Sequence, residues 1–285
     1  MLVTIKSDKL TASVNTLGAE LRSVKDEKGN EFMWSGDPAV WSGVAPVMFP
    51  ICSAVKSDKY KYKGKEYTLS KHGFARNSEF EVESHTENKA VFLLKSNAKT
   101  REVYPFDFEF RVVFEICDNK IKTDYCVKNL TDDTMYFAVG AHEGYATPEG
   151  IEEYDVVFDT PQTLDAYVLN VDVLTYNHHN IITDSKVISL KDEWFTDDAI
   201  VFPEIEAKAA TLVHRNGSKK IRIEFGSFEH LLIWHKYGAK YICIEPWNGM
   251  TDRPDSSGNM EDKYSMRQLA PGAEYEAHHS IEFEI

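Results

Sequence analysis

Hydrophobic and polar residues alternate with a period of two along most of this chain. The alternation runs through seven stretches, at residues 10–15, 79–83, 90–94, 106–116, 121–127, 221–225 and 281–285. Because successive side chains of a strand point to opposite faces, each stretch is predicted to be a strand with one buried face. No stretch of about twelve or more residues keeps apolar positions at helical spacing between capping residues, so few and short helices are expected.

Turn-forming residues separate these stretches. Lys63-Gly64, Asp118-Asn119 and Asn216-Gly217 are pairs that favour tight hairpins. No linker or internal repeat divides the chain, and apolar residues cross its middle at 194–202. We therefore expect one all-β domain over residues 1–285, built as a single large antiparallel β-sandwich. Functional side chains are expected on the long irregular segments 35–56, 140–150 and 248–262.

Composition narrows the class of protein. Hydrophobic residues make up 42% of the 285 residues, enough for a substantial core. The formal net charge of −14 argues against nucleic acid as a partner, because binding a phosphate backbone needs clustered Lys and Arg. Neither a signal sequence nor an apolar run long enough for a membrane is apparent, and the four cysteines lack paired spacings. We expect a cytoplasmic protein with no membrane partner.

Segment 71–76, Lys-His-Gly-Phe-Ala-Arg, is the first place where residues suited to chemistry gather. Gly73 beside His72 lets backbone and ligand approach closely, and Arg76 offers a planar fork of donors for sugar oxygens or a phosphate. The spacing also fits a purely structural interpretation. In that case His72 is hydrogen-bonded in a turn and Arg76 forms a surface ion pair.

Two further polar residues follow apolar strands. His142 comes after the apolar segment 135–139 and has small neighbours, so its imidazole has room to transfer protons near neutral pH. An ordinary loop histidine is the alternative. Glu245 ends the apolar segment 241–244 beside Trp247, and burial there would raise its pKa toward that of a general base. The alternative is a structural carboxylate paired with an arginine such as Arg267.

Metal and nucleotide sites are not predicted. The adjacent histidines 178–179 and 278–279 would point to opposite faces of a strand, so neither pair can chelate an ion in the ordinary way. The chain also lacks a glycine-rich phosphate loop between a strand and a helix, and it lacks a nucleophile elbow. No cofactor is therefore expected.

Three motifs, in this order, resemble those of the aldose 1-epimerase (galactose mutarotase-like) family, and of its LacX-like branch in particular. They are 72–76 (His-Gly-Phe-Ala-Arg), 140–142 (Gly-Ala-His) and 244–249 (Ile-Glu-Pro-Trp-Asn-Gly). Further similar segments lie at 15–21, 48–50, 198–202 and 269–272. The resemblance covers roughly residues 1–285. It implies a β-supersandwich whose concave face binds a sugar.

The resemblance also implies an activity. The chain would be a cofactor-independent mutarotase that interconverts the α and β anomers of a hexose. Glu245 would take the proton of the anomeric hydroxyl, His142 would protonate the ring oxygen, and His72 would bind the sugar near the reacting atoms. The residues predicted to bind other parts of the substrate are Arg76, Asp198, Trp247 and Lys56.

One departure from the family pattern keeps two alternatives open. Ala54 stands where relatives commonly have an arginine after the Phe-Pro motif, and Lys56 or Arg76 is expected to compensate. A hexose-6-phosphate 1-epimerase is the first alternative, favoured by Arg76. A non-catalytic carbohydrate-binding or sensing protein is the second, and the presence of both histidines and Glu245 weighs against it. The oligomeric state is not predicted.

Overall fold

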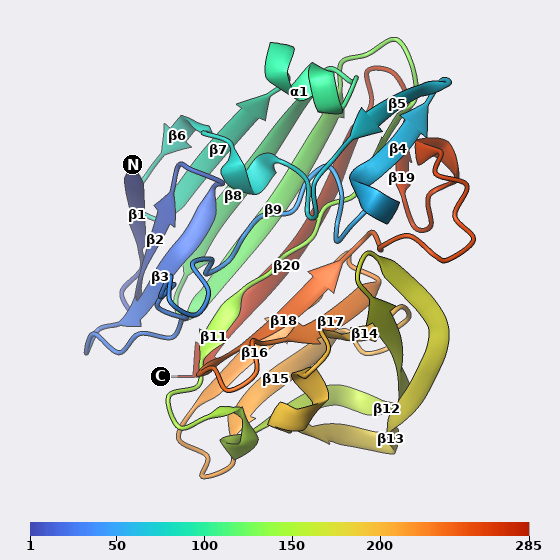
Figure 1. Ribbon diagram of the computed structural model, residues 1–285. Helices are drawn as coiled ribbons and strands as arrows, with labels where there is room; N and C mark the ends of the chain where they lie inside the picture. The colour runs from blue at the N-terminus through green and yellow to red at the C-terminus, as the bar shows by residue number, and fades with distance from the viewer. Residues whose placement is uncertain (285) are drawn as a thin grey trace.

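The computed structural model describes residues 1–284, and a continuous antiparallel sheet of 13 strands dominates it (Figure 1). In spatial order the strands are β11 (Gly144–Ala146), β18 (Tyr241–Trp247), β17 (His230–Trp234), β14 (Ile200–Phe202), β12 (Tyr154–Asn170), β15 (Ala209–His214), β16 (Lys220–Glu224), β20 (Glu274–Glu284), β9 (Lys120–Asn129), β8 (Phe108–Cys117), β7 (Lys89–Lys95) and β6 (Glu81–His85), with β13 (Val173–Ser189) paired to β12. The red strand β20 therefore joins the β6–β9 half of the sheet to the other half.

Smaller sheets and short helices complete the structure. The sheets are β1 (Leu2–Lys6), β2 (Leu10–Asn15) and β3 (Glu20–Asp26); β4 (Lys59–Tyr62) and β5 (Lys65–Thr68); and β10 (Met135–Phe137) and β19 (Arg267–Leu269). The helices are α1 (Ala98–Val103) and the 3-10 turns η1 (Lys56–Asp58), η2 (Ala75–Asn77), η3 (Ile151–Glu153), η4 (Asp192–Phe195) and η5 (Met260–Asp262). The expected all-β antiparallel fold with few, short helices is confirmed. None of these helices, within residues 1–284, has the length and apolar character to cross a membrane.

Alternation of buried and exposed residues accounts for the strands that the sequence predicted. On β8 every second residue from Phe108 to Ile116 is buried, and these side chains pack beneath the three-stranded sheet, whose β1 contacts β7 and β8. Phe49 enters the same layer, with its ring 4.4 Å from that of Phe110. One hydrophobic cluster extends from Val3 in β1 to Phe283 in β20.

Turn chemistry fixes the hairpins. Lys63 and Gly64 both have positive φ (48° and 79°) where β4 turns into β5, as a tight hairpin requires. Gly217 has φ 79° between β15 and β16.

The long strands β12 and β13 were not predicted. On β12 every second residue is buried at 154–158 and again at 162–166, but Pro161 and register shifts interrupt the strand, and most of β13 is exposed.

Candidate active site

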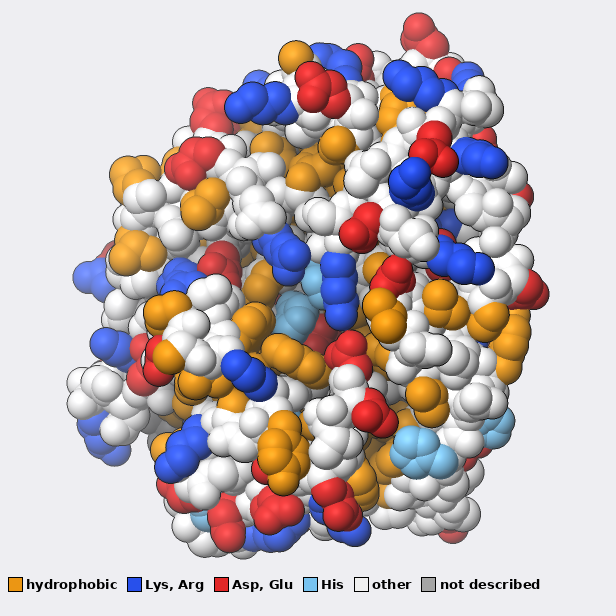
Figure 2. All heavy atoms as spheres, viewed as in Figure 1, with side chains coloured by type: hydrophobic (Ala, Val, Ile, Leu, Met, Phe, Trp, Pro, Cys, Tyr) orange, Lys and Arg blue, Asp and Glu red, His pale blue; other side chains and the backbone are white. Residues whose placement is uncertain are grey.

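A cavity of about 320 Å³ opens on the face shown in Figure 2, where basic and histidine side chains gather around a central hollow. Segments far apart in the sequence supply its walls. The lining residues are Trp41, Ser53, Lys71, His72, Arg76, His142, Leu169, Asp198, Ala199, Leu232, Trp234, Glu245 and Trp247. The cavity thus brings together the three motifs that sequence analysis identified.

Strand β18 presents Glu245 to this cavity. All seven residues of the strand are buried, and it pairs with β17 on one side and β11 on the other. Because side chains alternate along a strand, Cys243, Glu245 and Trp247 share one face. The Trp247 indole is fixed by a 3.1 Å hydrogen bond that its Nε1–H donates to the Ala141 carbonyl. A carboxyl group therefore stands on a rigid wall, 2% exposed.

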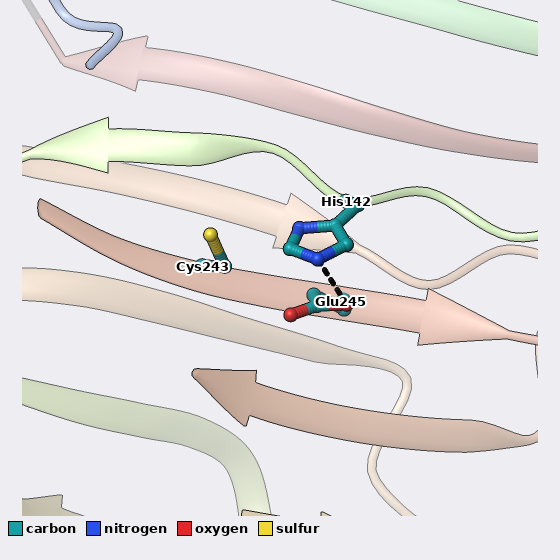
Figure 3. A group of neighbouring side chains, drawn as sticks. All are labelled: His142, Cys243 and Glu245. Atoms are coloured by element: carbon teal, nitrogen blue, oxygen red, sulfur yellow. Dashed lines mark ion pairs between the residues drawn. The ribbon is translucent and has the colours of Figure 1, made fainter. Parts of the chain in front are cut away.

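His142 approaches Glu245 from the segment between β10 and β11. Its Nε2 atom lies 3.5 Å from Oε2 of Glu245 (Figure 3). The imidazole ring stacks on Trp41, with ring centroids 5.2 Å apart, and meets the edge of Trp234 at 5.6 Å. Gly140 permits this approach, because a Cβ there would lie only 2.6 Å from the Trp247 ring. Sequence spacing alone did not reveal this closeness.

Burial pushes both members of the pair toward their neutral forms. It raises the pKa of Glu245 well above the ordinary carboxyl value, although the Lys71 ammonium group acts in the opposite direction. Burial also lowers the pKa of His142, to about 3. Because burial raises the pKa of the carboxyl group and lowers the pKa of the imidazole, the two groups 3.5 Å apart favour sharing one proton over carrying none or two.

His72 lies beside His142, with ring centroids 5.5 Å apart. Its backbone has φ 67°, and its Nδ1 accepts a 3.1 Å hydrogen bond from the backbone N–H of Ser53. Burial, followed by the nearby His142, lowers the pKa of His72 well below the usual value. The neutral ring therefore carries its proton on Nε2. His72 therefore accepts a structural hydrogen bond and also lines the cavity, so the two interpretations of this residue are compatible.

Charged side chains flank the cavity. The Lys71 ammonium group lies 3.6 Å from the Asp198 carboxylate. Arg76 is half-buried, and its Nε has no hydrogen-bond partner within residues 1–284. The surface ion pair considered for Arg76 is not observed there. Its guanidinium is consequently free to meet an oxygen-rich ligand.

Lys56 is not among the residues that line the cavity, so the prediction that it contacts substrate lacks support from the structure. Its ammonium group donates a 3.1 Å hydrogen bond to the carbonyl of Pro254 instead. Ala54 is buried, and its carbonyl accepts a hydrogen bond from Lys263. Of the two residues expected to compensate for the missing arginine, Arg76 lines the cavity and Lys56 does not.

Several lining residues were not predicted. Trp41 lies in segment 35–56, which was recognised only as a long irregular segment suited to function. Leu232 and Trp234 belong to β17, whose sequence reads as an ordinary core strand. Leu169 comes from the unpredicted strand β12. The one sequence feature that could have pointed to any of them is the presence of Trp41 in a long loop.

Potential metal ligands also converge here, which sequence spacing did not predict. The ligand atoms of His142, Cys243 and Glu245 all lie within 4.8 Å of one another, and all three residues are buried (Figure 3). His142 is separated from the other two by about a hundred positions. Only the pairing of β11 with β18 brings them together.

Comparison with known proteins agrees with this geometry. The sequence model of the aldose 1-epimerase family matches residues 1–282. The plasmid-encoded protein LacX of Lactococcus lactis subsp. lactis is 31% identical over 95% of both chains. A galactose mutarotase related enzyme from Lactobacillus acidophilus is 38% identical, with a TM-score of 0.96 over 100% of this chain and 98% of that one. A galactose mutarotase-like protein from Lactobacillus casei is 25% identical, with a TM-score of 0.93 and full coverage of both. This chain belongs to the aldose 1-epimerase family.

Proposed function

We propose that this isomerase interconverts the α and β anomers of a hexose, with Glu245 and His142 exchanging protons with the sugar. The observation that carries the proposal is the 3.5 Å approach of His142 Nε2 to Glu245 Oε2 inside a sugar-sized cavity. A base and an acid serve one pyranose when both lie within hydrogen-bond reach of O1 and the ring oxygen O5.

The proposed reaction balances within the pair. When the one proton of the pair lies on His142, the Glu245 carboxylate takes the proton of O1 while the His142 imidazolium gives a proton to O5, so the C1–O5 bond breaks and C1 becomes an aldehyde. Rotation about C1–C2 exposes the other face of the aldehyde. Glu245 then returns its proton to O1 while His142 takes a proton back from O5, and the ring closes as the other anomer. Each such proton transfer typically accelerates a reaction by about 10²–10⁴-fold.

Other lining residues are assigned to binding. His72 directs its Nε2–H into the cavity, where it suits a sugar oxygen next to the reacting centre. Trp247 offers an aromatic surface to the apolar C–H face of the sugar, and its ring lies 5.7 Å from that of His72. Asp198 and Arg76 are assigned to the remaining hydroxyl groups. Lys56 has no part in this assignment.

Two titratable groups account for the whole reaction, so we propose that no cofactor takes part. A cytoplasmic location also remains part of the proposal. It is supported by four cysteines that are all free thiols, as a reducing compartment keeps them.

A hexose 6-phosphate is a second candidate substrate. Lys71 and Arg76 both line the cavity, and of these Arg76 lacks an acidic partner among residues 1–284. A planar guanidinium suits bidentate contact with phosphate. Asp198 opposes this candidate, because its carboxylate lies 3.6 Å from Lys71 and neutralises much of that charge. A free hexose therefore remains the favoured substrate.

The test is Glu245→Gln, assayed by polarimetry on α-glucose and α-galactose. Gln keeps the shape of the side chain but removes the base, so turnover should fall by about 10²-fold or more. Glu276→Gln, on the exposed side of β20, is the matched control and should retain wild-type turnover. Unchanged turnover in a folded Glu245→Gln protein would refute the assignment.

A further inference from the structure

The face of β18 that carries Glu245 also carries a thiol that the proposed reaction does not use. Cys243 is two residues before Glu245, so both side chains leave the strand on one side (Figure 3). Cys243 is paired with Gly144 of β11, and Gly144 has no side chain to separate the thiol from His142. The three ligand atoms consequently lie within 4.8 Å of one another.

We propose that His142, Cys243 and Glu245 form an inhibitory site for Zn²⁺ in the floor of the cavity. Imidazole nitrogen, thiolate sulfur and carboxylate oxygen are the ligands that zinc prefers, and three protein ligands leave a fourth position open. His142 and Glu245 line the cavity, whereas the fully buried Cys243 does not, so the open position is assigned to the cavity side of the ion. An ion enters by the path that serves the sugar.

The distances suit a tetrahedral ion after a small adjustment. Ligands bound about 2.0–2.3 Å from zinc are roughly 3.3–3.7 Å apart. The His142–Glu245 separation of 3.5 Å already matches. The separations that involve Cys243 are at most 4.8 Å, so they must close by no more than about 1 Å to reach that range.

Charge also favours a divalent ion. Binding releases one proton from the Cys243 thiol and one from the His142–Glu245 pair, which leaves a thiolate, a carboxylate and a neutral imidazole around Zn²⁺. The net charge of the filled site is zero, so no uncompensated charge is left in this buried position. Thiolate ligation selects zinc over Mg²⁺ and Ca²⁺, which prefer oxygen ligands.

Occupation of the site blocks the proposed reaction, and this part of the inference rests on the proposed function. The metal takes the lone pairs of Glu245 and His142 that the reaction needs for proton transfer. Sugar and metal therefore compete, and added hexose should weaken inhibition by zinc. Mg²⁺ and Ca²⁺ should not inhibit.

Cobalt titration tests the site without any assay of activity. Co²⁺ replaces Zn²⁺ and gives a near-ultraviolet absorption when a thiolate binds it. The wild-type protein should show this absorption at one equivalent, and Cys243→Ser and Cys243→Ala should both lack it. The double variant Cys117→Ala/Cys126→Ala, which removes the two more accessible thiols, is the matched control and should keep it.

Inhibition by zinc is the second measurement, expressed relative to the metal-free activity of each variant. Loss of the sulfur ligand should raise the inhibitory zinc concentration by about tenfold or more, since even indirect partners of metal ligands contribute 10–100-fold to affinity. Equal inhibition of wild type and Cys243→Ser, or a cobalt absorption that survives both Cys243 variants, would overturn the proposal. A protein that binds cobalt through Cys243 but has no epimerase activity would instead count against the proposed function.

Discussion

The backbone N–H of Ser53 donates a 3.1 Å hydrogen bond to Nδ1 of His72, and this contact determines the tautomer of the ring. Since Nδ1 accepts, the neutral imidazole presents an N–H at Nε2 to the cavity. Ser53 in turn accepts the backbone N–H of His72 at 2.6 Å. Two reciprocal hydrogen bonds therefore aim one donor at the substrate.

Replacing His72 by Asn should weaken catalysis modestly. Asn tolerates the positive φ of this position, but its shorter side chain no longer delivers the donor. A hydrogen bond between neutral groups contributes about 0.5–1.5 kcal/mol, so kcat/KM should fall by roughly 3–10-fold. A coupled mutarotation assay across pH measures this. Because burial keeps His72 neutral, the pH profile should not change, and a shifted profile would show that His72 itself titrates.

The buried Glu245 carboxyl should make stability fall as pH rises. Its pKa is raised in the folded protein, so the unfolded chain loses this proton first, near pH 4.3. Stability is then lost progressively from that pH up to the folded pKa. Glu245→Gln cannot ionise and escapes this loss. Its melting temperature should match that of wild type near pH 4 and exceed it at pH 8, and thermal melts at both pH values would show whether the difference grows.

Sequence patterning predicts those parts of the fold in which one strand face is buried. Segment 10–15 is β2 residue for residue, and the prediction at 106–116 differs from β8 (Phe108–Cys117) by two residues at most at either end. Strand β12 escapes prediction because Pro161 and register shifts interrupt it, and β13 because most of its residues are exposed. There the pairing depends on neighbouring strands rather than on the local pattern.

The site follows the same division. Motifs identify His72, His142 and Glu245, and the last two are conspicuous in sequence because each follows an apolar segment. Cys243 is not conspicuous, since a small thiol inside an apolar strand reads as core. The position of Lys56 also could not be predicted, because its direction is set by a contact with Pro254, about two hundred positions away.

Arg76→Gln should separate the two candidate substrates. A hydrogen bond to a charged group contributes about 1.5–3 kcal/mol, against about 0.5–1.5 kcal/mol between neutral groups. If the cavity accepts a hexose 6-phosphate at all, kcat/KM for it should fall by about tenfold or more, while that for the free hexose falls by less. Lys71→Gln is the comparison, and its effect should be smaller because Lys71 already faces Asp198. Equal losses on both sugars would show that Arg76 contacts no phosphate.

The last prediction concerns a buried ion pair behind the cavity wall, between Lys263 and Asp252 at 2.8 Å. The Lys263 ammonium also donates to the Ala54 carbonyl at 3.1 Å, next to Ser53, and Asp252 accepts the backbone N–H of Lys56 at 2.8 Å. Lys263→Met leaves a buried carboxylate without its counterion and should lower the free energy of unfolding by about 3–5 kcal/mol, measured by urea denaturation. Adding Asp252→Asn removes that charge while keeping an acceptor for Lys56, so the double variant should regain much of the loss. A double variant as unstable as the sum of the two single variants would mean that the two side chains act independently, and that the ion pair does not hold this wall.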